Sequence, residues 1–311
     1  MARGRGRMRT RKLGRFGPEL TVLGFGTWAL GGDGWAGSWG PQDRAESIAA
    51  LHAAVELGVN WIDTAPAYGL GRAESIVGEA LGGTDVFVAT KCGERIDGDR
   101  TYRSGKPDGI VADCESSLRR LGRDVIDLYQ LHHPPPDVPV EEAWQAMADL
   151  VTAGKVRYLG LCNGGLEQLT KCQAIHQVDS FQGSYSLLRR GLEAEVLPFC
   201  QEYGIGVLPF GALGHGFLSG RFDTNRLAPD DWRRADRWHD EIGRGTALTA
   251  RLDPVARRLG ATVGQLCTAW LIDHPAVTAT PVGTRSVAQA RENFGGPEIA
   301  GARALIAEKS A

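Results

Sequence analysis

Eight short apolar, β-branched runs alternate along the chain with eight segments of helical periodicity, and this alternation constrains the fold more than any other feature. Strand–helix units joined by short connections predict a parallel sheet covered by helices, and eight units predict closure into an α/β (β/α)8 TIM barrel. A doubly wound open sheet is the weaker alternative, because no Gly-x-Gly-x-x-Gly turn opens the first unit. The expected strands are residues 22–25, 61–63, 86–90, 126–131, 156–161, 180–182, 206–209 and 277–282, and the expected helices are residues 44–57, 74–81, 108–121, 140–153, 166–175, 192–203, 262–273 and 287–293.

Three stretches fall outside the alternation. Residues 1–12 interleave arginine with glycine and predict a basic, disordered tail, with either Met1 or Met8 as the start, ahead of a single barrel domain over residues 13–311. Residues 13–21 predict an N-terminal β-hairpin that plugs the barrel bottom. Residues 211–245, after the seventh strand, lack clear periodicity, and a loop of this length is typically a lid or binding loop.

Composition narrows the class of protein. The net charge of −2 gives no global attraction to nucleic acid or to a membrane surface. No apolar run approaches the ~20 residues that span a bilayer. The six cysteines are scattered without a Cys-x-x-Cys pair, which predicts a reduced cytoplasmic protein without zinc or disulfides. We therefore expect a small-molecule partner, no nucleic acid, no membrane and no metal.

Four polar side chains stand at or just after the carboxyl ends of predicted strands: Asp63, Tyr68, Lys91 and His132. The carboxyl ends of the strands of an α/β barrel form its catalytic face, so these side chains are expected to meet there. Each one alone has an ordinary alternative role, such as a turn cap for Asp63 or a surface position for Lys91. Four in this order indicate a catalytic site.

Together the four side chains predict an acid that acts on a carbonyl oxygen. When hydride reaches a carbonyl carbon, negative charge builds on the oxygen and a proton donor must meet it. Tyr68 is the expected donor, and the Lys91 ammonium is expected to lower the pKa of its phenol from ~10. Asp63 would keep Lys91 charged, and His132 would orient the substrate oxygen. Strand parity assigns catalysis to His132 and pocket lining to its neighbour His133.

The chain resembles the aldo-keto reductase family over about residues 9–296. The similar segments are Gly26-Thr27-Trp28, the run from Asp63 to Gly69, Lys91, Leu131-His132, and residues 154–160, 182–186, 216–220 and 281–293. The resemblance implies a monomeric or weakly associated barrel that acts on a small-molecule carbonyl substrate. It also implies NADPH (NADP+) as the cofactor, with NADH possible, bound without a Gly-rich Rossmann turn.

The resemblance also implies roles for individual residues. Asn163 and Gln182 would hydrogen-bond the nicotinamide carboxamide, since an amide side chain offers donor and acceptor, and Phe210 would stack on the ring. Arg285 would grip the 2′-phosphate bidentately. The other implied cofactor contacts are Gly26, Thr27, Trp28, Leu213, Gly216, Leu218, Arg221, Gly283, Thr284, Gln289, Glu292 and Asn293. An aromatic substrate pocket would be lined by Trp28, Trp35, Trp39, Trp61 and His133.

The predicted function is NADPH-dependent reduction of an aldehyde or ketone to an alcohol, with the proton from Tyr68. Two alternatives remain open: an NAD(P)-dependent sugar or alcohol dehydrogenase working in the oxidative direction, and a cofactor-sensing regulatory subunit with little turnover. Departures from the family pattern affect cofactor affinity and substrate range. They are Gly211-Ala212 where Ser-Pro is usual, Cys162 where Ser is usual, and an unfamiliar run over residues 238–241.

Overall fold

Eight parallel strands form the central sheet of the protein, for which a computed structural model describes residues 8–307. The sheet order is β11-β10-β9-β8-β5-β4-β3-β12, and a parallel bridge between Val207 and Val277 joins its two edges. The predicted (β/α)8 barrel is thus confirmed. The strands are β3 (Leu23–Gly26), β4 (Trp61–Asp63), β5 (Phe87–Cys92), β8 (Ile126–Leu131), β9 (Val156–Cys162), β10 (Ser180–Gln182), β11 (Gly206–Val207) and β12 (Thr280–Gly283).

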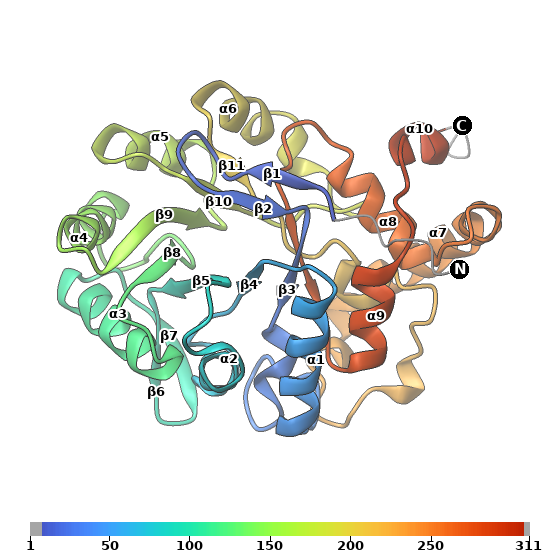
Figure 1. Cartoon of the computed structure of the whole chain (residues 1–311), viewed down its shortest axis with the longest axis horizontal. Coiled ribbons are helices and arrows are strands. Elements are labelled where there is room, and N and C mark those ends of the chain that lie inside the picture. The colour runs from blue at the N-terminus through green and yellow to red at the C-terminus, as the bar shows by residue number, and fades with distance from the viewer. Residues whose placement is uncertain (1–7, 308–311) are drawn as a thin grey trace.

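Helices surround the sheet on the outside (Figure 1). Local sequence sets their ends: Pro107 begins one helix, left-handed Gly122 ends it, and a Thr262–Gln265 capping box begins another. The helices are α1 (Arg44–Glu56), α2 (Arg72–Leu81), α3 (Pro107–Leu121), α4 (Val140–Thr152), α5 (Leu166–Ile175), α6 (Val196–Tyr203), α7 (His239–Arg258), α8 (Val263–Ile272), α9 (Val287–Gly295) and α10 (Ala302–Ala307). None of the helices among residues 8–307 is both long and apolar enough to cross a bilayer.

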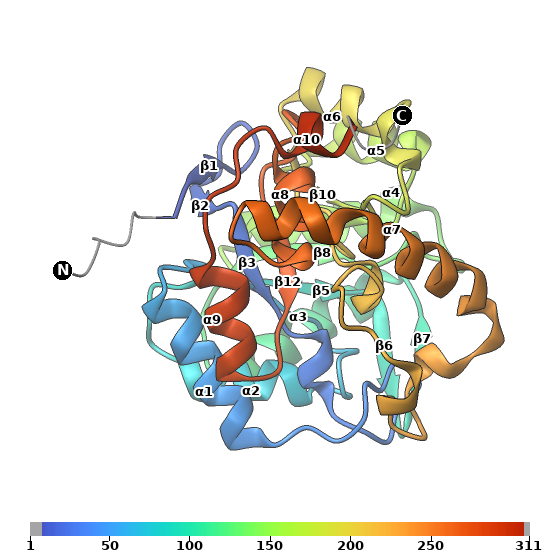
Figure 2. The same cartoon turned by 90° about the vertical axis from the view of Figure 1, so that its right-hand side faces the viewer.

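An N-terminal hairpin closes the end of the barrel opposite its mouth. It pairs β1 (Thr10–Lys12) with β2 (Glu19–Thr21), and the two views place it at the upper end of the barrel (Figures 1 and 2). Leu13 and Leu20 are fully buried against the barrel interior. The hairpin is confirmed, but it begins at Thr10, inside the stretch expected to be a disordered tail. Residues 1–7 of that tail lie outside the described part of the chain.

Trp61 belongs to this closed end and corrects the expected substrate pocket. Its side chain is fully buried, and its indole N–H donates to the carbonyl oxygen of Thr21 over 2.8 Å. The Trp61 ring fills the space beside Gly24, where a β-carbon would lie 2.1 Å from it. Trp61 therefore packs the core beneath the hairpin and takes no part in the mouth.

Two insertions at the opposite end were not predicted as regular structure. A hairpin of β6 (Glu94–Asp97) and β7 (Arg100–Arg103) follows β5 directly. Residues 211–245 contain short 3-10 turns at Gly214–Gly216, Thr224–Arg226, Trp232–Arg234 and Asp236–Trp238, and the first turns of α7. Both insertions lie toward the lower right of Figure 2, away from the N-terminal hairpin.

Candidate active site

The four predicted catalytic side chains meet at the mouth of the barrel. Asp63 ends β4, and Lys91 lies on the adjacent strand β5, two residues beyond Ala89, which is opposite Asp63. A two-residue step returns to the same face of a strand, so both side chains point into the barrel. Lys91 Nζ donates to Asp63 Oδ1 over 2.8 Å and lies 5.0 Å from the centre of the Tyr68 ring. The Tyr68 and His132 rings are edge to face, with centres 5.9 Å apart.

Asp63 has partners for both carboxylate oxygens. Lys91 bonds Oδ1, while the side-chain amides of Gln182 and Gln130 donate to Oδ2 over 2.8 and 3.4 Å. Burial alone would lower the pKa of Lys91, but Asp63 and Tyr68 outweigh it and hold that pKa above its ordinary value. Lys91 Nζ also donates to the backbone oxygen of Thr64 over 2.9 Å. Lys91 is thus a fully buried ammonium.

The acidity of Tyr68 differs from the expectation. Burial raises the pKa of its phenol above the ordinary value, and the nearby Lys91 only partly opposes this effect. The Lys91 ammonium lowers this pKa as expected, but burial of the phenol outweighs it. The physical reason is that removing a phenolate from water is more unfavourable here than its attraction to one ammonium is favourable. Tyr68 remains a protonated hydrogen-bond donor.

The backbone after Tyr68 fixes the phenol in place. Gly69 has φ of +62°, and a β-carbon there would lie 2.1 Å from the carbonyl oxygen of Gly31. Only glycine allows this close contact between the segment after β4 and the segment after β3. The Trp28 ring stacks on the Tyr68 ring with centres 6.2 Å apart.

His132 follows β8, and its backbone N–H donates to the carbonyl oxygen of Cys92 over 3.0 Å. Burial, then the positive charges of Lys91 and Arg103, hold the pKa of His132 well below its ordinary value, so the imidazole is neutral. The His133 ring stacks on it with centres 4.9 Å apart.

The three residues expected to hold the nicotinamide lie at neighbouring strand ends. Asn163, in the left-handed region with φ of +56°, donates its amide to the carbonyl oxygen of His132 over 2.9 Å and is exposed. Gln182 is 2% exposed, its amide nitrogen donates to Asp63, and its oxygen accepts from the Cys162 thiol over 3.8 Å. Phe210 is half-buried beside them and bridges to Ser184. These groups fit a planar amide-bearing ring.

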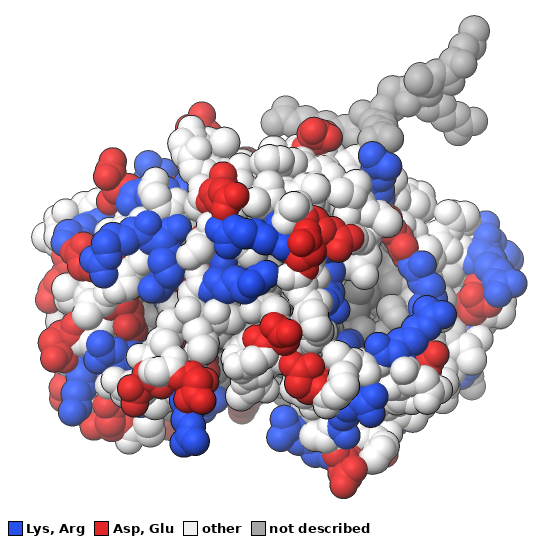
Figure 3. All heavy atoms as spheres, turned by 90° about the horizontal axis from the view of Figure 1, so that it is seen from below, with Lys and Arg blue, Asp and Glu red and all other residues white. Residues whose placement is uncertain are grey.

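The residues expected at the adenosine end lie just before α9 and along it. Ser286 caps the helix by accepting from the backbone N–H of Gln289 over 3.2 Å, and Asn293 donates to the Thr284 hydroxyl over 3.0 Å. Such a helix N-terminus favours anions. Seen from below, the mouth face has a hollow on its right side with Lys and Arg side chains along the rim (Figure 3). The donors and positive charge fit a dinucleotide phosphate.

Arg285 makes contacts that its sequence position did not predict. Its guanidinium donates to the Gln42 side chain over 2.8 Å and to the carbonyl oxygens of Trp39 and Pro41 over 3.1 and 2.6 Å. Burial lowers its pKa from the ordinary value, although the group stays charged. Arg285 thus links the segment after β3 to the start of α9 through hydrogen bonds.

The other implied cofactor residues are divided between the mouth and the core. Thr27 donates its hydroxyl to the backbone oxygen of Asp63 over 3.0 Å, and Arg221 forms an ion pair with Glu292. A β-carbon at Gly283 would meet open space, which suits a backbone close to a ligand. Gly26 is buried, Leu213 and Gly216 are half-buried, and Leu218 is fully buried against the core.

An aromatic cluster forms one wall of the mouth, and two of its members were missed. Trp232 stacks on Trp28 with ring centres 5.1 Å apart, and the His215 ring contacts both edge to face. Trp39 packs edge to face on the same pair, whereas Trp35 bonds the Gly32 carbonyl nearby. The Asp-Trp-Arg-Arg run at 231–234 was a usable signal for Trp232, but His215 had none.

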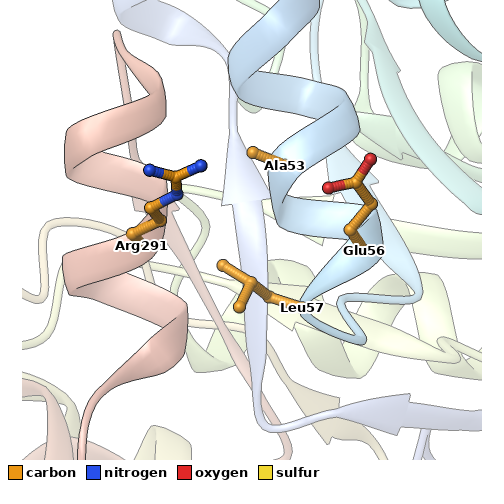
Figure 4. Close-up of a pocket in the computed structure, with 4 residues that line it drawn as sticks. All are labelled: Ala53, Glu56, Leu57 and Arg291. Carbon is orange, nitrogen blue, oxygen red and sulfur yellow. The ribbon is translucent and has the colours of Figure 1, made fainter.

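A further surface pocket of about 400 Å³ lies between α1 and α9 on the outside of the barrel. Figure 4 shows Ala53, Glu56, Leu57 and Arg291 around it. It holds none of the catalytic side chains.

Comparison with known proteins agrees with this geometry. The sequence model of the Aldo/keto reductase family matches residues 22–299. The chain belongs to the aldo/keto reductase family. It is an NAD(P)H-dependent oxidoreductase, as the members of this family are. Among curated relatives of this aldo-keto reductase, the aldo-keto reductase YhdN of Bacillus subtilis (strain 168) is 37% identical over 281 residues, which cover 88% of this chain and 84% of the relative.

A second curated relative and two solved structures extend the comparison. The NADH-specific methylglyoxal reductase of Escherichia coli (strain K12) is 31% identical over 300 residues, covering 90% of this chain and 91% of the relative. A glycerol dehydrogenase from Gluconobacter oxydans has a TM-score of 0.85 and 30% identity, covering 96% and 94% of the two chains. An aldo-keto reductase from Klebsiella pneumoniae in complex with NADPH has a TM-score of 0.73 and 27% identity, covering 97% and 95%.

Proposed function

We propose that this aldo-keto reductase reduces an aldehyde or ketone to an alcohol and that Tyr68 donates the proton. The observation that carries the proposal is the buried ammonium of Lys91, 2.8 Å from Asp63 and 5.0 Å from the Tyr68 ring. A fixed positive charge at this position stabilises the phenolate that is left when Tyr68 gives up its proton. A bound NADPH, with NADH possible, supplies the hydride.

The other residues of the mouth bind, orient and exclude water. Asn163, Gln182 and Phe210 would hold the nicotinamide end, and the residues at the start of α9 would hold the phosphates. The Trp28 ring stacks on one face of Tyr68. An apolar wall around a charged group strengthens the interaction between Lys91 and the developing phenolate.

The names of similar proteins are consistent with either NADPH or NADH as the cofactor. One similar structure is a complex with NADPH, and one similar enzyme is NADH-specific by name. Arg285 favours NADPH in this chain, because a guanidinium matches the geometry of a 2′-phosphate. We further propose that the enzyme works in the cytoplasm as a monomer or weak homo-oligomer.

The test replaces Tyr68 with phenylalanine. The variant is expected to bind NADPH as the wild type does and to lose carbonyl reduction by a factor on the order of 10² or more, because its acid is missing. Steady-state assays with a panel of aldehydes and ketones measure kcat/KM, and NADPH fluorescence measures binding. Tyr203→Phe, on the exposed surface of α6, is the matched control. Wild-type kcat/KM in Tyr68→Phe would remove Tyr68 from the mechanism.

The oxidative direction is the second candidate. A similar structure is a glycerol dehydrogenase by name, at 30% identity over nearly the whole chain. Assays with glycerol and other alcohols, using NADP+ and NAD+ in turn, measure this direction. The four catalytic residues argue for turnover and against a regulatory subunit. Absence of turnover in both directions with either cofactor would favour the regulatory alternative.

A further inference from the structure

A glutamine, Gln130, lies fully buried inside the barrel, where branched apolar side chains are the rule. It stands on β8 two residues before His132, so its side chain is on the inward face of the strand. Taking an amide out of water is unfavourable unless both of its ends find hydrogen-bond partners. The partners of Gln130 therefore explain why this position is polar.

Both ends of the Gln130 amide contact polar side chains on other strands. Its Nε2 donates to Asp63 Oδ2 over 3.4 Å, and its Oε1 accepts from the Cys162 thiol over 3.6 Å. An ionised carboxylate only accepts hydrogen bonds, so Asp63 selects the nitrogen end of the amide. Gln130 is thus a donor to the same carboxylate that pairs with Lys91.

The neighbouring strand leaves room for this amide. Gly160 of β9 is paired with Gln130 in the sheet, and a β-carbon at Gly160 would lie 2.7 Å from Gln130 Cγ and 2.3 Å from the Ser180 hydroxyl oxygen. Glycine inside a strand weakens the strand and often marks a place where another group needs the space. The barrel interior is therefore shaped to hold Gln130 at this position.

A second amide donates to the same oxygen of Asp63. Gln182 Nε2 bonds Oδ2 over 2.8 Å, and Gln182 Oε1 accepts from the same Cys162 thiol over 3.8 Å. A thiol has one proton, so Cys162 donates to only one of the two glutamines at a time. The two glutamines thus share one acceptor and one donor, and Gln182 is the closer donor to Asp63.

We propose that Gln130 is a positioning residue that takes over Asp63 Oδ2 when Gln182 turns its amide nitrogen to the nicotinamide carboxamide. This exchange of donors keeps Asp63 in place, and Asp63 in turn keeps the Lys91 ammonium fixed. The inference rests on the proposed function, in which Gln182 binds the cofactor. If Gln130 did not move in, Oδ2 would be a buried, charged oxygen without a close donor, which is unfavourable.

The exchange couples cofactor binding to the pair of Asp63 and Lys91. A chain that lacks the Gln130 donor would have to leave Asp63 Oδ2 short of a hydrogen bond whenever it binds the cofactor, and this cost would appear as weaker cofactor binding. The cost depends on the negative charge of Asp63, because an uncharged amide oxygen at the same place needs a donor less. Gln130 is therefore expected to change cofactor affinity only through Asp63.

A double-mutant cycle on cofactor affinity tests the exchange. Gln130→Met keeps the length of the side chain and removes its donor, and fluorescence titrations with NADPH and with NADH measure Kd. Gln130→Met should weaken the binding of both by about 10-fold, the effect of one hydrogen bond to a charged group. In an Asp63→Asn background the same change should weaken binding by less than roughly 2-fold. Ser180→Ala is the matched control and should leave Kd unchanged, because this buried hydroxyl across Gly160 has no hydrogen-bond partner among residues 8–307.

A crystal structure of the wild type with NADP+ decides the exchange without any variant. We expect Gln130 Nε2 within about 3.0 Å of Asp63 Oδ2, and Gln182 Nε2 bonded to the carboxamide. The proposal is overturned if Gln182 still donates to Asp63 while Gln130 stays at 3.4 Å or farther. It is also overturned if Gln130→Met weakens cofactor binding equally in both backgrounds. Carbonyl assays decide the proposed function separately: a protein that binds NADPH and reduces no carbonyl refutes that function, while the titrations and the crystal structure still decide the exchange.

Discussion

Replacing Lys91 with methionine separates the two effects of the buried ammonium, on stability and on catalysis. Lys91 and Asp63 are both buried and 2.8 Å apart, so the methionine variant leaves a carboxylate without its counter-charge. Removal of one partner from a buried pair costs roughly 3–5 kcal/mol of unfolding free energy. Asp63 keeps hydrogen bonds from Gln182 and Gln130, which places the expected loss near the lower limit, about 3 kcal/mol.

Unfolding in denaturant and calorimetry measure this loss. For a chain of this size about 3 kcal/mol corresponds to a fall in Tm of roughly 4–5 °C. Lys155→Met is the matched control, because Lys155 pairs with Glu115 at the surface and the loss of stability there should be far smaller. Carbonyl reduction should fall by a factor on the order of 10² or more in Lys91→Met and remain unchanged in Lys155→Met.

The double variant Asp63→Asn/Lys91→Met distinguishes charge pairing from packing. It removes both charges, so it should recover most of the lost stability and none of the lost activity. The reasoning is refuted if the double variant is no more stable than Lys91→Met, because the cost would then come from the lost side-chain volume. It is also refuted if Lys91→Met retains wild-type kcat/KM, because the ammonium would then have no part in proton transfer.

Three other predictions follow from single contacts. Arg285→Ala should weaken NADPH binding more than NADH binding in fluorescence titrations. Gln42→Ala loosens the same segment without removing charge and should weaken both equally. Equal losses of affinity for NADPH and NADH in Arg285→Ala would show that Arg285 only supports the local structure. Burial raises the pKa of Asp179 to about 6, although the hydrogen bond from the backbone N–H of Leu159 opposes this rise. The contribution of Asp179 to stability is therefore fully present below about pH 4 and is lost as the pH rises through 6. Asp179→Asn should therefore exceed wild type in unfolding free energy by about 1–3 kcal/mol at pH 7 and match it near pH 4, and a constant difference would contradict the assignment. Amides in residues 211–245 should exchange faster without NADPH than with it, and equal protection in both states would indicate a preformed groove.

The barrel was predictable because its units are long and periodic, whereas the two insertions were not. The strands β6 and β7 have four residues each, are rich in charge and are partly exposed, so no alternation marks them. The helix α7 contains Gly243, Gly245 and Pro254, which are residues that normally argue against a helix. Tertiary packing of its apolar residues, such as Leu252 and Val255, overrides these local signals.

The structure brings together the four side chains that were predicted at strand ends. Strand ends identified Asp63, Tyr68, Lys91 and His132, because each lies on or beside a strand with clear periodicity. The contacts of Arg285 could not be predicted from the sequence, since its partner Gln42 is 243 residues away in the chain. Trp61 was wrongly assigned to the substrate pocket. The sequence of a strand that begins with an aromatic residue does not show whether that side chain faces the mouth or the closed end of the barrel.

In the proposed mechanism, the raised pKa of Tyr68 and the buried charge of Lys91 act at different stages of one proton transfer. Before transfer, burial disfavours the phenolate, so the proton stays on Tyr68 at neutral pH. During transfer, charge moves from the substrate oxygen toward the phenol, and Lys91 is already in place to meet it without rearrangement. Because Asp63 and its two glutamine partners hold the ammonium charged and fixed, the stabilisation is greater in the transition state than in the ground state. Only interactions of this kind accelerate the chemical step.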